Sequence, residues 1–319
     1  MIAVKNLTKK FANVEALKGI SFSIDKGEIF GLLGPNGAGK TTTISILSTL
    51  TQQDSGEVTL NGFDVNKDSK KVKQIIGVVP QEIALYQELT AYDNLIFWGG
   101  LYDIPADKLK DKVNEILKLV GLFERKDDKI KTYSGGMKRR INIASALLHS
   151  PEIIFMDEPT VGIDPQSRNL IYDVIETLNK KGITIVYTTH YMEEAERLCK
   201  RIGIIDNGKI VAQGTIDELH AANDTKQCIV IKISNMMSEQ VERDGIISKF
   251  ISEEIGEVPK ANFTFRNGAL QYFSKDIKND LPRLINRLSK FSLEISHVDI
   301  QKPTLESIFL SLTGKELRD

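Results

Sequence analysis

Hydrophobic residues along the chain form two kinds of pattern, which together predict an α/β fold. Short runs are apolar at almost every position, as expected for strands buried on both faces, and lie at residues 75–81, 153–158 and 182–190. Other stretches, such as residues 108–120, have apolar residues at helical intervals. We therefore expect a sheet of buried strands with a helical insertion at about residues 82–148.

Alternating patterns predict antiparallel strands beside this core. Residues 1–27 alternate as short strands joined by a loop at residues 12–18, and residues 54–65 contain a strand closed by an Asn-Gly turn. A second Asn-Gly pair, Asn207 and Gly208, predicts a hairpin near the end of the domain. The pattern thus predicts one α/β domain over residues 1–222, with an antiparallel β subdomain.

Residues 223–319 are predicted to form a smaller α+β domain. Its elements follow the order β-α-β-β-α-β of the ferredoxin-like arrangement, at residues 229–233, 238–255, 262–266, 269–273, 279–291 and 293–300. A last helix begins at Pro303 and Thr304 and has an apolar face. This helix has two interpretations: it docks on its own domain, or it contacts a second subunit or a membrane partner.

Composition narrows the class of protein. The chain has 319 residues, 41% hydrophobic and 27% charged, which is typical of about two globular domains. Its formal net charge of −1 lacks the basic excess expected when nucleic acid is the main partner. No apolar run approaches a membrane-spanning length, and no signal-peptide pattern is present. Two widely spaced cysteines form no metal or redox pattern, so we expect a reducing cytosol.

The most specific chemical signal is a glycine-rich segment between an apolar run and a helical one. Gly34, Gly39, Lys40 and Thr41 match the pattern G-x-x-x-x-G-K-[ST]. Glycines let backbone N–H groups converge on phosphate, and the helix adds the positive end of its dipole. The lysine then reaches the β- and γ-phosphates, and the threonine hydroxyl binds Mg²⁺. A tight strand-to-helix turn is the alternative, which the flanking pattern disfavours. The predicted phosphate-binding residues are Gly34, Pro35, Asn36, Gly37, Ala38, Gly39, Lys40, Thr41 and Thr42.

Polar residues end three of the buried strands, at the edge where ligands bind in open α/β sheets. Asp157 is a candidate Mg²⁺ ligand, and Glu158 is a candidate general base for the attacking water. Gln81 is expected to orient Mg²⁺ or water, or else to cap a loop. His190 is assigned to the site, although a lone histidine more often has a packing role.

Two further features are open to two interpretations each. Ser134, Gly135 and Gly136 precede an amphipathic helix and form either a second anion site or an ordinary helix start, which their composition alone favours. Phe11, before the glycine-rich segment, either stacks on an adenine ring or belongs to the core.

Taken in order, these motifs resemble those of the ATP-binding subunits of ABC transporters, over about residues 1–222. The resemblance makes Phe11 the adenine-stacking residue, Gly34 to Thr41 the Walker A motif, Gln81 the Q-loop glutamine, Tyr133 to Lys138 the signature motif, Asp157 the Walker B aspartate, Glu158 the catalytic glutamate, Asp164 the D-loop aspartate and His190 the switch histidine. The signature has YSGGM where LSGGQ is common, and the D-loop has VGID in place of SALD. The signature keeps its Ser-Gly-Gly core, and the D-loop keeps its aspartate.

The resemblance implies a mechanism and partners. Two such domains pack head to tail, and each ATP, with Mg²⁺, lies between the Walker A loop of one and the signature helix of the other. The chain is then a homodimer or pairs with a similar subunit, on the cytoplasmic face of the membrane through permease subunits. Their contact is expected at residues 83–98 and the helical insertion. The last segment, from Lys302, resembles ATPases of ABC-2 type exporters, whose substrates include drugs, antibiotics and lipids.

Other ABC ATPases act without a transporter, on nucleic acid or ribosomes. Repair and chromosome types carry a long coiled coil between Walker A and the signature. Here the segment between Thr41 and Ser134 is too short to contain one. Ribosome-acting members usually carry two ATPase domains in one chain. A regulatory protein that binds ATP without turnover is disfavoured by the presence of Glu158 and His190.

Overall fold

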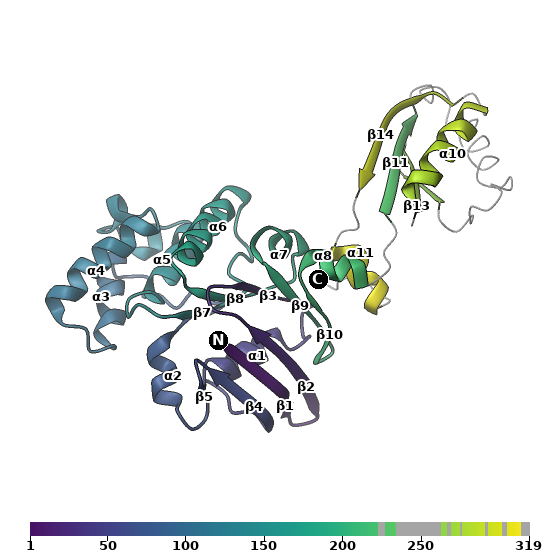
Figure 1. The fold of residues 1–319 in the computed structure, drawn as a ribbon. Helices are drawn as coiled ribbons and strands as arrows, with labels where there is room; N and C mark the ends of the chain where they lie inside the picture. Colours follow the sequence, from purple (N-terminus) through teal and green to yellow (C-terminus); the bar gives the residue numbers. More distant parts are fainter. Residues whose placement is uncertain are drawn as a thin grey trace. The chain divides into compact units, whose positions relative to one another are not determined.

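The structure, a computed structural model shown in Figure 1, describes residues 1–222, 227–233, 263–266, 269–274, 276–290, 293–301 and 305–313. It divides into two compact units, Met1–Asp217 and Glu218–Lys315. We describe each unit by itself.

A six-stranded sheet forms the centre of the first unit. Its strands, in sheet order, are β10 (Lys209–Gly214), β9 (Arg201–Asp206), β3 (Ile29–Leu33), β8 (Thr184–Thr189), β7 (Ile153–Asp157) and β6 (Ile76–Val79). The strands pair in parallel except for β10, which is an antiparallel edge. The three buried runs of the sequence are thus confirmed as neighbouring strands, β6, β7 and β8.

A four-stranded antiparallel sheet packs against the six-stranded sheet through a shared hydrophobic core. It contains, in order, β2 (Val14–Ile24), β1 (Ile2–Phe11), β4 (Ser55–Leu60) and β5 (Phe63–Asp64). The predicted loop at residues 12–18 is wrong, because only Ala12 and Asn13 separate the strands. Glu15 and Lys18 are exposed on β2, so their polarity marks a solvent-facing strand and not a loop.

The main hydrophobic core fills the space between the two sheets around α1 (Lys40–Leu47). Ile44, Ile46 and Leu47 of this helix are buried there, and the ring of Phe22 stacks on that of Phe30 at 5.5 Å. Figure 1 shows α1 on one side of the parallel sheet and helices α6 and α7 on the other. Burial on both faces explains why these strands are apolar throughout.

Helices connect the strands as the α/β pattern predicts. They are α2 (Ser69–Ile75), α3 (Ala91–Gly100), α4 (Ala106–Leu119), α5 (Gly135–Ser145), α6 (Pro165–Lys180) and α7 (Met192–Leu198). Helix α8 (Ile216–Ala222) contains the division between the two units. Short 3₁₀ turns lie at Phe123–Arg125 and Ile130–Thr132. The group from α3 to α5 is the helical insertion, between β6 and β7 in the chain.

The second unit contains a four-stranded antiparallel sheet. Its order is β12 (Phe263–Arg266), β13 (Ala269–Ser274), β11 (Gln227–Ile233) and β14 (Ile295–Gln301), and its helices are α10 (Ile277–Lys290) and α11 (Leu305–Thr313). Leu284 and Leu288 of α10 pack on Ile229 and Ile231 of β11. The predicted strands are confirmed, and the predicted helix at residues 238–255 lies outside the described residues.

Among the described residues, no helix combines the length and apolar character needed to cross a bilayer.

Two glycines allow a matched test of how closely β6 packs on the insertion. A Cβ at Gly77 would lie 2.4 Å from the carbonyl oxygen of Ala146, whereas a Cβ at Gly100, the last residue of α3, would meet no atom within 4 Å. We expect Gly77→Ala to lower the free energy of unfolding by about 1–3 kcal/mol, as overpacking does. Gly100→Ala should leave it unchanged or raise it, because alanine favours helix. Denaturant titration of both variants measures the difference, and equal stabilities would contradict the packing described.

Candidate nucleotide-binding and catalytic site

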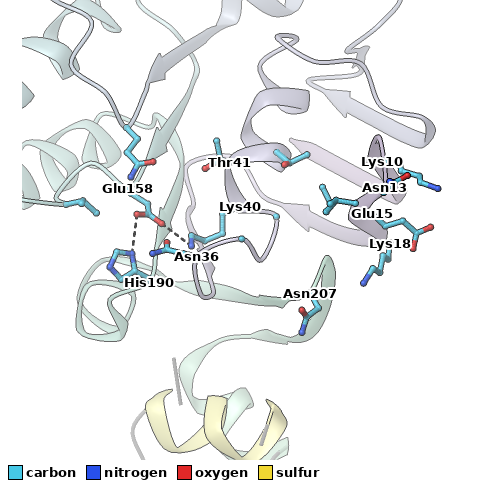
Figure 2. Close-up of a pocket in the computed structure, with 17 residues that line it drawn as sticks. Lys10, Asn13, Glu15, Lys18, Asn36, Lys40, Thr41, Glu158, His190 and Asn207 are labelled. Atoms are coloured by element: carbon cyan, nitrogen blue, oxygen red, sulfur yellow. Dashed lines mark hydrogen bonds and ion pairs between the residues drawn. The ribbon is translucent and has the colours of Figure 1, made fainter. Parts of the chain in front are cut away.

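A pocket of about 980 Å³ lies beside the glycine-rich loop, where strands of the parallel sheet end (Figure 2). Its lining contains predicted residues from four separate parts of the sequence: Asn36, Gly37, Gly39, Lys40, Thr41, Thr42, Gln81, Glu158 and His190. Strands β3, β6, β7 and β8 deliver these residues. Their parallel pairing places all four carboxyl ends at one edge of the sheet.

The loop between β3 and α1 has the backbone geometry that a phosphate-binding loop needs. Gly37 and Gly39 adopt positive φ angles of 79° and 113°, which side chains of L-residues disfavour. A Cβ at Gly34 would lie 2.1 Å from the carbonyl oxygen of Ile205, so this position excludes any side chain. Ala38 is buried below the loop and accepts a hydrogen bond from the N–H of Gly208.

The ammonium group of Lys40 contacts two backbone carbonyl oxygens and one carboxylate. Nζ donates to the carbonyl oxygens of Gly34 and Pro35, at 2.7 and 3.0 Å, and lies 3.0 Å from Oε1 of Glu158. The Lys40 and Glu158 side chains are 4% and 6% exposed, so water screens their attraction little. The ammonium is therefore fixed between the backbone at the start of the loop and the Glu158 carboxylate.

Glu158 joins Lys40 to His190. Its second carboxylate oxygen, Oε2, lies 3.2 Å from Nδ1 of His190, and Figure 2 shows both interactions as dashed lines. Glu158 adopts a φ of 46°, unusual for a non-glycine residue and costly in backbone strain. This turn at the end of β7 brings the carboxylate toward Lys40 and His190, and the Glu158 N–H is held by Oγ1 of Thr188 at 2.9 Å.

Thr188 also holds Asp157. Its hydroxyl donates to Oδ1 of Asp157 at 2.7 Å, and both residues are buried. Asp157 lies outside the pocket lining, one residue from Glu158. Thr188 was not among the predicted site residues, because its role depends on the pairing of β7 with β8.

The residues proposed to hold Mg²⁺ fit that ion by the chemistry of their donors. Thr41 supplies a hydroxyl, Gln81 an amide oxygen and Asp157 a carboxylate, and Mg²⁺ prefers oxygen ligands. No group of three or more acidic, histidine or cysteine side chains suited to a metal occurs in the part of the chain that the structure describes. A Mg²⁺ site that also uses water and phosphate oxygens needs no such group.

Gln81 lies on a loop held by a residue that the sequence did not single out. Arg139 of α5 donates to the carbonyl oxygens of Pro80, at 2.7 Å, and Gln81, at 2.5 Å. Burial lowers the pKa of the Arg139 guanidinium. Asn142, one turn further along α5, contacts the backbone of Glu82 and Ala84 at 3.4 Å. The helix that follows the signature residues thus fixes the Gln81 loop.

The signature residues themselves do not line the pocket. Ser134 caps α5 by accepting a hydrogen bond from the N–H of Met137 at 3.2 Å, and both Ser134 and Gly135 are exposed. Gly136 is buried, and a Cβ there would lie 2.2 Å from Cβ of Ser167 on α6. Serine capping is therefore the interaction present within the chain, and Gly136 permits the close approach of α5 to α6.

Asp164 also has a local interaction and lies outside the pocket lining. Its Oδ1 accepts a hydrogen bond from the N–H of Ser167 at 2.9 Å, which caps α6 and lowers the pKa of the Asp164 carboxyl.

Phe11 is 48% exposed, so the interpretation as a core residue is wrong. It lies at the end of β1, with the Lys9 ammonium 5.2 Å from its ring centre. The pocket is instead lined at this end by Asn13 and Val14, and Val14 is 66% exposed. The sequence offers one signal for Val14 as a pocket residue, which is that it is an apolar residue beside a polar turn.

Comparison with known proteins identifies relatives that match this chain over nearly their whole length. Residues 17–161 match the family model described as ABC transporter. The chain is 44% identical to the linearmycin resistance ATP-binding protein LnrL of Bacillus subtilis, over 100% of both chains. It is 35% identical to the doxorubicin resistance ATP-binding protein DrrA of Mycobacterium tuberculosis, over 98% of this chain and 93% of that protein. It is 34% identical to the Nod factor export ATP-binding protein I of Ralstonia nicotianae, over 100% and 95%.

Solved structures share the fold of the first unit. A dimeric ATP-binding cassette in a post-hydrolysis state, bound to ADP and Pi, is 29% identical and superposes with a TM-score of 0.61, covering 68% of this chain and 99% of that one. The residues matched by the family model lie within residues 1–222, the region in which the sequence resembles this family. The chain therefore belongs to the ATP-binding proteins of the ABC transporter family.

Proposed function

We propose that this protein binds and hydrolyses ATP and thereby powers export by an ABC-2 type transporter. The observation that carries the proposal is the continuous contact of Lys40, Glu158 and His190 in the pocket beside the glycine-rich loop. Members of this family hydrolyse ATP, and the relatives that match over the whole chain are named for resistance or export. We assign the protein to the cytoplasmic face of the membrane, through permease subunits.

In the proposed reaction, the ATP phosphates lie against the N–H groups of the loop and the ammonium of Lys40. A water molecule attacks the γ-phosphorus, Glu158 accepts its proton, and the bond to the β-phosphate oxygen breaks to give ADP and inorganic phosphate. When bound by Thr41, Asp157 and Gln81, Mg²⁺ supplies positive charge to the phosphate oxygens. His190, 3.2 Å from Glu158, orients the carboxylate. Phe11 is proposed to stack on the adenine ring from its exposed position.

The site requires a second copy in this proposal. Ser134 and Gly135 are exposed and Asp164 lies outside the pocket, so these residues are available to a partner subunit. We propose that two chains pack head to tail, with ATP between the glycine-rich loop of one and Ser134 to Gly136 of the other. The dimeric relative with bound ADP and Pi supports this arrangement.

A second cavity supports the proposed contact with a permease. This groove, of about 590 Å³, lies between β6 and the helical insertion, and exposed apolar residues such as Leu50, Leu101 and Tyr102 line it. Ala84 and Trp98, from the segment predicted to contact the permease, also line it. We propose that an apolar cytoplasmic segment of the permease binds there. The proposed substrate is a drug, antibiotic or lipid, and the relatives named for linearmycin and doxorubicin resistance support a drug or antibiotic.

The role of Glu158 as general base can be tested with Glu158→Gln. We expect turnover to fall about 100-fold or more, which is typical when a general base is removed. ATP binding should be retained or strengthened, because Lys40 loses a competing anion at 3.0 Å. Hydrolysis assays, with light scattering to detect the ATP-bound dimer, measure both effects. The exposed Glu152, which precedes β7, provides the control Glu152→Gln with full turnover. Rapid turnover by Glu158→Gln, or only monomers with ATP and Mg²⁺, would contradict the mechanism.

The role of Lys40 in binding can be tested by calorimetry. Lys40→Ala removes the charge-assisted contact to phosphate, so we expect ATP affinity to fall about 10- to 100-fold. Lys5→Ala, at a side chain that is 71% exposed, is the matched control and should bind normally. Unchanged affinity in Lys40→Ala would show that the loop does not bind ATP as proposed.

The groove can be tested by recovering the permease from detergent-solubilised membranes. Leu101→Glu places a charge at a residue that is 64% exposed and lines the groove, so permease recovery should fall while ATP affinity is unchanged. Val211→Glu, at another exposed apolar residue, should recover the permease normally. Normal recovery with Leu101→Glu would exclude the groove, and recovery of no membrane protein by the wild type would contradict the export function.

A further inference from the structure

A buried carboxylate lies four residues after His190. Glu194, on α7, is 2% exposed and has no part in the reaction described above. Hydroxyl groups donate to both of its oxygens: Thr160 and Tyr172 to Oε1, at 2.6 and 2.9 Å, and Tyr187 and Thr189 to Oε2, at 2.8 and 2.9 Å. A carboxylate has about four lone-pair sites, so these donors saturate it.

This arrangement offsets the cost of burying the charge mainly with neutral donors. The nearest cation described is Arg168, whose Nε lies 3.7 Å from Oε1, beyond hydrogen-bond distance. The Tyr187 hydroxyl stays a donor at physiological pH, because burial and the Glu194 charge raise its pKa well above the usual value. Removing one donor leaves a buried acceptor unsatisfied, which costs free energy. The four hydroxyl groups are therefore held in fixed positions around the carboxylate.

Each donor belongs to a segment that carries a residue of the proposed site. Thr160 follows Glu158 by two residues, and Thr189 lies directly between Thr188 and His190. Tyr172 is on α6, the helix that Asp164 caps. Glu194 therefore joins, from behind the pocket, the chain segments that present Glu158, His190 and the D-loop.

We propose that Glu194 is a positioning residue that fixes Glu158 and His190 relative to each other. This inference rests on the roles proposed above for those two residues. Their contact spans 3.2 Å between two side chains, and displacements of about 1 Å in such a contact reduce catalysis strongly. Among the described residues, Glu194 contacts neither Lys40 nor the glycine-rich loop, so we expect ATP binding not to depend on it.

The test compares Glu194→Gln with Glu28→Gln in the purified full chain. Glu28 is also buried, at 5% exposure, where it accepts from the N–H of Asp25 and contacts Arg201, and it does not line the pocket. Both variants therefore lose one buried carboxylate charge. We expect Glu194→Gln to lower kcat about 10- to 100-fold, which is typical when a residue that orients the functional side chains without touching the substrate is lost. The Kd for ATP should stay within about twofold, a change of less than 0.5 kcal/mol. Glu28→Gln should keep the wild-type kcat.

Tyr187→Phe provides a second variant that keeps the buried ring and removes one donor. We expect it to lower kcat several-fold, without a change in ATP affinity, even if Glu194→Gln folds poorly. Normal kcat in Tyr187→Phe or in folded Glu194→Gln would overturn the inference, and so would equal losses in Glu194→Gln and Glu28→Gln or a parallel loss of ATP affinity. A wild-type chain that binds ATP without hydrolysing it would instead overturn the proposed function.

Discussion

The carboxylate of Glu158 has a different partner at each oxygen, and the geometry of the site depends on this division. Lys40 lies 3.0 Å from one oxygen and His190 lies 3.2 Å from the other, so a single side chain at the end of β7 links groups that follow β3 and β8. The arrangement requires the strained backbone of Glu158, whose φ is 46°. This strained backbone conformation persists because the Thr188 hydroxyl binds the Glu158 N–H and the paired ends of β7 and β8 hold the residue in place.

The sequence predicted that these residues lie together where chain order and sheet geometry determine their positions. Gln81, Glu158 and His190 each follow a buried run, and parallel pairing alone brings such strand ends together. It predicted the fold equally well where apolar runs are continuous. It failed at residues 12–18, because a strand with one face in water contains the same polar residues as a loop.

Residues whose importance depends on tertiary contact could not be predicted. Nothing in the sequence around Arg139 indicates that its guanidinium reaches the carbonyl groups of Pro80 and Gln81, more than fifty residues away in the chain. Thr188 looks like any other residue of a buried strand until its neighbour β7 is known. Ser134 illustrates the opposite limit: the sequence indicated its helix-capping role, whereas the role proposed for it in a nucleotide site requires a second chain.

The contacts of Arg139 have a consequence for how such a protein can diverge. The guanidinium binds main-chain oxygens, so the identities of the side chains at positions 80 and 81 do not affect the link. Pro80 and Ala84 of the same loop line the apolar groove, while Gln81 lines the nucleotide pocket. In the proposed contact with a permease, the side chains at positions 80 and 84 can therefore be exchanged to suit a different membrane protein while Arg139 still holds the loop to α5. Recognition of the proposed partner by these two side chains and attachment of the loop through its main chain are, in this chain, separable traits.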